Sequence, residues 1–186
     1  MLNEEAYTAL SDYVASTGMP MMMLETFKPG LLVSTLQIIE FQKIGFTPQG
    51  VDMYFNSRAI GDAKSLGQLE TAEEQIGFLA SMGEGSESDF ILMSLEDLDE
   101  TEEMIAAWRG GDNGQLSELF IAEMAIVAPD LYASLLVNRN QAWIPQIEEM
   151  LTDGDTEFIL VGAAHLVGDQ GLLRLLEEKG YQITQL

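Results

Sequence analysis

Apolar residues recur at helical spacing along most of the chain. In residues 2–17 one face is apolar, Asn3 stands where a helix cap is expected, and Gly18 ends the pattern. Thr71 and Glu74 have the spacing of a capping box at the start of a later helix. The other predicted helices cover residues 31–46, 51–63, 88–109, 113–128 and 129–154, and Pro145 predicts a helix start or a kink.

Three segments have the pattern of strands instead. Residues 157–162 include the continuous apolar run FILV, which is typical of a buried strand. A helix follows, then a closing strand over 181–186, which predicts a C-terminal β-α-β unit. With a further short strand at 65–69, the pattern predicts a single α/β domain over residues 1–186, a helix-rich α+β fragment with several helices around a small sheet.

The charge of the chain excludes one class of partner. It has 31 acidic and 8 basic residues, a net charge of −23, so its surface repels nucleic-acid backbones and we expect no nucleic-acid binding. No cysteine is present, which excludes disulfides, zinc–thiolate sites and thiol catalysis. No apolar run approaches the length of about 20 residues that a membrane span needs.

His165 is the only histidine, and it follows the predicted strand in the stretch VGAAH. Ligands in α/β folds bind at the carboxyl ends of strands, so an imidazole here is placed to bind a metal or to move a proton. A histidine whose ring bonds a backbone carbonyl at a strand end explains the same pattern, and the residues alone favour that explanation.

Two other stretches carry candidate chemistry. Glu70 precedes the capping box, and capping does not account for it. Arg139 stands between Asn138 and Asn140, a set of donors suited to a carboxylate or an oxyanion, although a cation among acids is usually a salt bridge.

Five short motifs, taken in chain order, resemble the TraB/PrgY/GumN family, which includes the Tiki proteins. They are GVD, LET-EEQ, Trp108 with Gly111 and Asp112, RN---W and VGAAHL-G--GLL. The resemblance covers nearly the whole chain. It implies an exported, periplasmic or membrane-associated protein related to metal-dependent peptidases, which acts on a peptide or small-molecule substrate.

The resemblance also implies roles for individual residues. Residues 162–165 match the second of two GxxH motifs, which makes His165 the expected ligand of Mn²⁺, Co²⁺ or Zn²⁺ in the intact protein. Arg139 and Asn140 match the RN pair, and Glu70 matches the LET position, where its role is catalytic or structural. We therefore predict Glu70, Arg139 and Asn140 as the catalytic group.

The first GxxH motif of the family is absent. A site with two histidines cannot form from one copy, so we expect the 186 residues to be an N-terminally truncated member, inactive as a fragment and without a bound metal. The predicted strand 157–162 would lack a neighbour, so we also expect a homo-oligomer through the exposed sheet edge. The alternative function is a non-catalytic peptide- or signal-binding protein with a groove at Met19–Met23, although ordinary core explains those methionines too.

Overall fold

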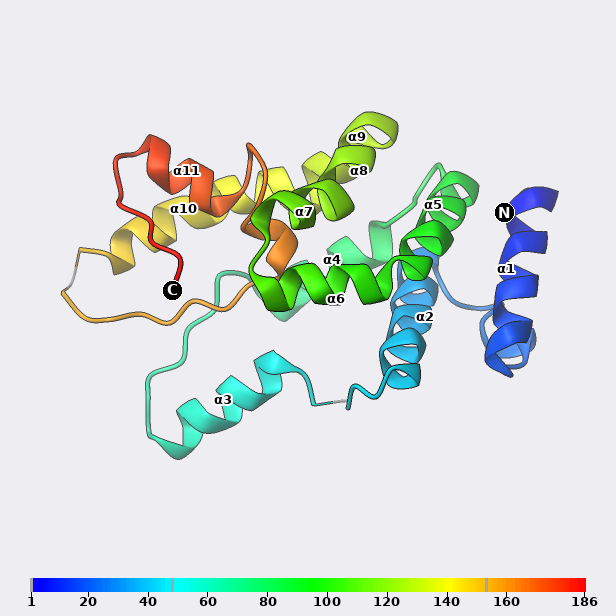
Figure 1. Cartoon of the computed structure of the whole chain (residues 1–186), viewed down its shortest axis with the longest axis horizontal. Helices are drawn as coiled ribbons and strands as arrows, with labels where there is room; N and C mark the ends of the chain where they lie inside the picture. The colour runs from blue at the N-terminus through cyan, green and yellow to red at the C-terminus, as the bar shows by residue number, and fades with distance from the viewer. Residues whose placement is uncertain (1, 48, 153) are drawn as a thin grey trace. The chain divides into compact units, whose positions relative to one another are not determined.

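The computed structural model describes residues 2–47, 49–152 and 154–186, and the regular secondary structure in these residues is entirely helical. No strand occurs among these residues. The helices along the chain are α1 (Glu4–Thr17), η1 (Met21–Met23), α2 (Pro29–Lys43), α3 (Val51–Gly61), α4 (Ala72–Ser81), α5 (Glu87–Asp99), α6 (Thr101–Gly110), α7 (Asn113–Ser117), η2 (Glu118–Ala122), α8 (Glu123–Val127), α9 (Pro129–Tyr132), η3 (Ala133–Val137), α10 (Asn138–Met150), η4 (Ala163–His165) and α11 (Leu172–Glu178). Figure 1 shows them in chain order.

The chain divides into two compact units, residues 1–101 and 102–186. In the first unit, α5 packs against both α1 and α2. Their shared core consists of Leu10, Val14, Leu24, Leu32, Leu36, Ile91 and Leu98. The core is apolar and well covered, since Leu36 is 0% exposed and each of the others at most 6%. This burial stabilises the unit because each leucine-sized side chain that leaves water contributes about 1.5–3 kcal/mol.

Local signals set the ends of the helices in this unit. The Asn3 side chain accepts a hydrogen bond from the backbone N–H of Ala6 at 2.8 Å, as a helix cap should. The backbone N–H of Thr71 donates to the Glu74 carboxylate at 2.8 Å, and the Glu74 N–H donates back to the Thr71 hydroxyl at 3.2 Å. Both predicted caps are therefore confirmed.

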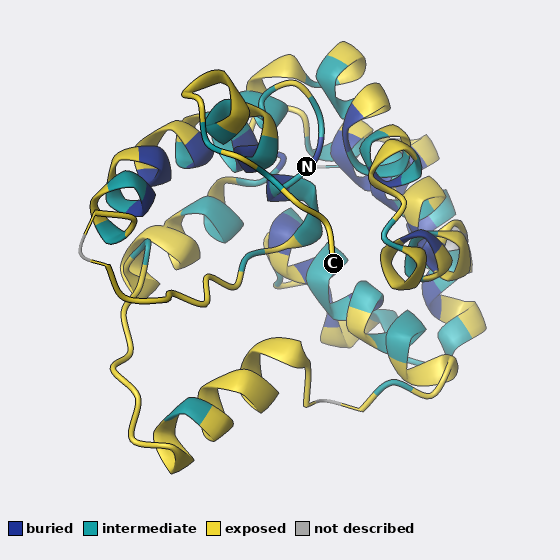
Figure 2. Cartoon of the chain, turned by 60° about the vertical axis from the view of Figure 1, so that its left-hand side comes forward, coloured by how far each residue is buried: buried dark blue, intermediate teal, exposed yellow. Residues whose placement is uncertain are grey.

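Helix α3 buries none of its residues. Three of its large side chains, Met53, Tyr54 and Phe55, are 57%, 50% and 37% exposed. In Figure 2 this helix is coloured as exposed along nearly its whole length. A helix is thus correctly predicted here, but its apolar residues do not join a core.

The second unit is built from helices α6 to α11. One hydrophobic core cluster of this unit contains the buried residues Ala107, Leu116, Ile121, Leu136 and Val167. Segments η2 and η3 are π-helical stretches within longer helical runs, an arrangement often found at functional sites. Helices α10 and α11 contact each other (Figure 1), and Lys179 at the end of α11 pairs with Glu148 of α10 at 2.9 Å.

The predicted α/β class is wrong, because none of the three expected strands forms. Residues 157–162 lie outside any helix or strand, and Phe158 is 69% exposed while Ile159 and Leu160 are each 36% exposed. Residues 65–69 and 181–186 are likewise without strand structure, so the C-terminal β-α-β unit is absent. An apolar run becomes a strand only when another segment pairs with its backbone, and no described segment does so here.

The same finding removes the premise of the expected oligomer contact. Among the described residues there is no sheet and hence no sheet edge. Association between copies of the chain stays a prediction, without a sheet edge to carry it.

Candidate functional site

His165 is the last residue of η4, in the loop that leads from residues 156–162 into α11. Its side chain is buried, with 6% of the residue exposed. The loop folds back at Gly168, whose φ of +79° favours glycine, and a Cβ there would lie 2.9 Å from the Ile121 side chain. The absence of a side chain at Gly168 therefore lets the loop pack closely against Ile121 in the π-helical segment η2.

Helix α10 supplies the groups that surround the imidazole. Asn140 and Trp143 are three residues apart, so they lie on the same face of the helix. Both are buried, at 1% and 4% exposure. Arg139 precedes Asn140 and is half-buried. Segment η3 ends at Val137, so this π-helical stretch directly precedes the part of α10 that forms the site.

Asn140 joins α10 to the loop through three hydrogen bonds. Its Oδ1 lies 2.7 Å from Nδ1 of His165. Its Nδ2 donates to the backbone carbonyls of His165 at 3.2 Å and of Gln170 at 2.8 Å. The two contacts with His165 are buried and the one with Gln170 is partly buried, so the contacts with His165 are the most costly to lose.

Trp143 contacts both the imidazole and a positive charge. Its ring centroid lies 4.4 Å from that of His165, with the planes tilted by 42°. The Arg139 guanidinium carbon lies 5.1 Å from the Trp143 ring centroid, in cation–π contact. Nη1 of Arg139 also donates to the Leu135 carbonyl at 2.9 Å, one helical turn earlier.

These surroundings keep the imidazole neutral. Burial, followed by the positive charge of Arg139, lowers the pKa of His165 from 6.5 to about 4. At neutral pH the ring therefore offers one lone pair for a proton, a hydrogen-bond donor or a metal.

The structure brings together three of the four predicted site residues: Arg139, Asn140 and His165. Glu70 belongs to the first unit, where it is half-buried and immediately precedes the Thr71 cap. Trp143 occurs in the pattern that resembles the family, but the sequence reasoning gave it no role. Because Trp143 follows Asn140 by three residues, helical spacing could have predicted that both side chains lie on the face toward His165.

The described residues do not fit a divalent metal. They contain no group of three or more His, Cys, Asp or Glu side chains placed to hold an ion. Around His165 the neighbours are an amide, an indole and a guanidinium, and the positive charge of Arg139 opposes a second cation. We therefore derive no chemical step through a metal.

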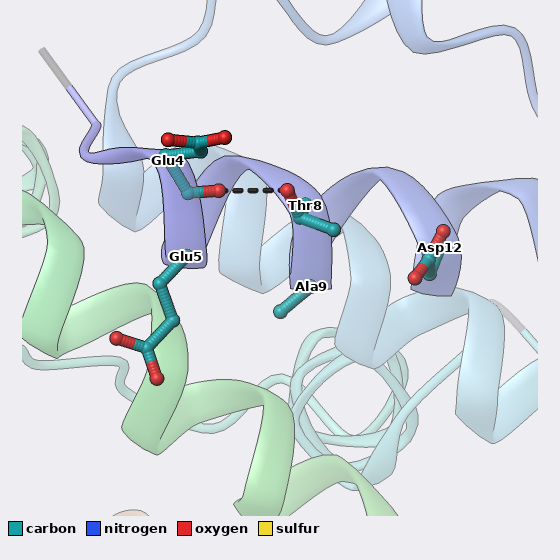
Figure 3. A pocket seen from close by; sticks show the side chains of 5 residues that line it. All are labelled: Glu4, Glu5, Thr8, Ala9 and Asp12. Carbon is teal, nitrogen blue, oxygen red and sulfur yellow. Dashed lines mark hydrogen bonds between the residues drawn. The ribbon is translucent and has the colours of Figure 1, made fainter.

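A hollow lies on the acidic face of α1. Glu4, Glu5, Thr8, Ala9 and Asp12 line it, and the Thr8 hydroxyl donates to the Glu4 carbonyl at 2.7 Å. Figure 3 shows that the three carboxylates point in different directions and do not converge on one point. This surface is an acidic helix face that faces solvent.

Comparisons with known proteins agree with the resemblance in the sequence. No helix in the described part of the chain is both long and apolar enough to cross a membrane. No curated protein and no solved structure matches the chain. The sequence profile of the TraB/PrgY/gumN family matches residues 1–185, essentially the whole chain, and the protein therefore belongs to the TraB/PrgY/gumN family.

Proposed function

We propose that the protein is a hydrolase of peptides or related acyl compounds, with the His165 imidazole at the centre of its site. The observation that carries this proposal is a buried neutral imidazole, fixed by Asn140 and next to the cation Arg139. A neutral imidazole accepts a hydrogen bond or a proton from a reacting group. A nearby guanidinium attracts a substrate carboxylate or the oxyanion that forms during acyl transfer.

By the family resemblance, His165 is also the residue that would bind an ion of Mn²⁺, Co²⁺ or Zn²⁺, but no chemical step of the proposal passes through such an ion. The described residues offer it a single nitrogen, so the site they form is incomplete for a metal.

The test uses chromogenic peptide and ester substrates, with and without each of the three metals. We expect His165→Ala to lower any hydrolysis roughly 100-fold or more, as the loss of a proton-transfer group does. Gln141→Ala is the matched control, because Gln141 is an exposed residue on the same helix. Hydrolysis or metal uptake that is equal in the wild type and in His165→Ala would overturn the role of His165.

A non-catalytic peptide-binding protein is the second candidate. Met22 and Met23 in η1 are 75% and 60% exposed, whereas Met19 and Met21 pack against the core of the first unit. Exposed methionines adapt to varied apolar partners. This candidate predicts that peptide binding is lost in a Met22→Ser, Met23→Ser double variant and unchanged in His165→Ala, the reverse of the result expected for the hydrolase.

A further inference from the structure

The amide of Asn140 has only one orientation that satisfies its neighbours. Two backbone carbonyl oxygens, of His165 and Gln170, face its Nδ2 at 3.2 and 2.8 Å. Carbonyl oxygens only accept, so the group facing them must be the NH₂, which has two hydrogens to give. Turning the amide over would bring its oxygen against both carbonyls in a buried setting. The carbonyl oxygen of Asn140 therefore faces the imidazole.

This orientation decides which ring nitrogen of His165 carries the proton. Oδ1 of Asn140 only accepts, and it lies 2.7 Å from Nδ1, so Nδ1 must donate. In the neutral ring, the other nitrogen, Nε2, then holds the lone pair. A neutral imidazole free in water prefers the opposite arrangement, with the proton on Nε2.

The lone pair on Nε2 faces an open edge of the ring. None of the described residues bonds to Nε2, and every buried side-chain nitrogen and oxygen among them has a partner, so Nε2 reaches the surface. A Cβ at residue 162 would lie 3.8 Å from Cδ2, the carbon next to Nε2. With glycine at 162 no side chain from that residue lies against this edge, while Trp143 packs against the ring.

We propose that Asn140 is a positioning residue, which holds His165 as the Nδ1–H tautomer and so makes Nε2 the atom that meets a substrate or a ligand. Asn140 does not itself touch a substrate, because it is only 1% exposed and its Nδ2 and Oδ1 both bond the loop. Only one part of this inference rests on the proposed function, namely that the group bound by Nε2 is a substrate or a ligand. The tautomer follows from the contacts alone.

Asn140 also ties two points of the loop, at residues 165 and 170, to α10. A variant can therefore loosen the loop for purely structural reasons, and a loss of activity would not separate the two roles. The test must therefore measure directly which nitrogen of the His165 ring is protonated.

The ring nitrogens of the only histidine can be read directly by ¹⁵N NMR of the full chain at neutral pH, where they form a single spin system. We expect Nδ1 to have the shift of a protonated nitrogen and Nε2 that of an unprotonated one. In Asn140→Ala we expect the proton to move to Nε2 or to exchange between both nitrogens. Gln141→Ala, at an exposed position of the same helix, should match the wild type.

Two results would overturn the proposal. One is a wild-type protein with the proton on Nε2, a measurement that needs no variant and does not depend on how a variant folds. The other is a folded Asn140→Ala protein that keeps the proton on Nδ1. A wild-type Nδ1–H tautomer together with no hydrolysis of any substrate would instead reject the proposed function and leave the positioning role in place.

Discussion

The low pKa of His165 predicts that acid destabilises the second unit. Burial and the charge of Arg139 lower the pKa of this imidazole from 6.5 to about 4 in the folded protein. In the unfolded chain the same group titrates near its ordinary value. As the pH falls below about 6.5, the His165 imidazole binds a proton in the unfolded state but not in the folded state. The contribution of the neutral imidazole to stability is therefore complete above that pH and is lost as the pH falls toward about 4.

The size of this effect follows from the shift. A difference of about 2.5 pKa units, at about 1.4 kcal/mol for each unit, gives an upper limit between about 3 and 4 kcal/mol. Nε2 of His165 reaches the surface, and contact with water weakens the effects of burial and of Arg139. We therefore expect a loss of about 2–3 kcal/mol between roughly pH 7 and pH 4.

The assay is urea unfolding followed by tryptophan fluorescence. Both tryptophans, Trp108 and Trp143, lie in the second unit, so the signal reports on that unit alone. The free energy of unfolding is measured between about pH 7 and pH 4 for the wild type and for His165→Gln, which cannot become charged. The 31 acidic residues are common to both proteins, so their titration largely cancels in the difference.

The expected result is a wild-type advantage that shrinks by about 2–3 kcal/mol as the pH falls. Parallel loss of stability in the two proteins would refute the reasoning. An NMR titration of the His165 ring gives the folded pKa independently, and a value near 6.5 would show that the ring is not desolvated as the structure indicates.

Other predictions concern packing and backbone. Leu36→Ala, at a fully buried position in the first unit, should lower the free energy of unfolding by about 2–5 kcal/mol, measured by far-UV circular dichroism in urea, while Ile38→Ala, 53% exposed, should change it little. Gly171→Ala should cost about 3 kcal/mol or more by tryptophan fluorescence, because its Cβ would lie 2.7 Å from the Leu166 carbonyl carbon and still closer to two backbone oxygens. Gly180→Ala, with open space and a φ of +93°, should cost only about 1–2 kcal/mol; equal losses at both glycines would contradict the steric explanation. Gly77→Ala, exposed within α4 with nothing near its Cβ position, should raise the thermal midpoint through a gain of about 0.5–1 kcal/mol.

Helices and their caps were predictable because their causes are local. Asn3 and the Thr71–Glu74 pair bond backbone groups within three residues, so the sequence pattern contains both partners. Breaks within helical runs were harder to predict. The helix predicted over 88–109 is two helices, α5 and α6, which meet at Glu100. No glycine or proline marks that break.

The candidate site was predictable only through family resemblance. The residues alone favoured a core histidine, and His165 is indeed buried, but its ring bonds the Asn140 side chain and not a backbone carbonyl. Arg139 and Asn140 were proposed from the RN pair, and their closeness to His165 across 25 residues of sequence depends on how α10 meets the loop. Glu70 follows the same pattern and lies in the other unit.

The sequence by itself determined where helices start, which of their faces are apolar, and that the chain carries a large negative charge. It also determined family membership, since the matching motifs run in order along the whole chain. Only the tertiary structure decided that residues 157–162 form no strand, because a strand depends on a partner that is distant in sequence. It likewise decided the state of His165: burial, the Asn140 amide and the Arg139 charge set its pKa and its tautomer, and all three arise from contacts between segments far apart in the chain.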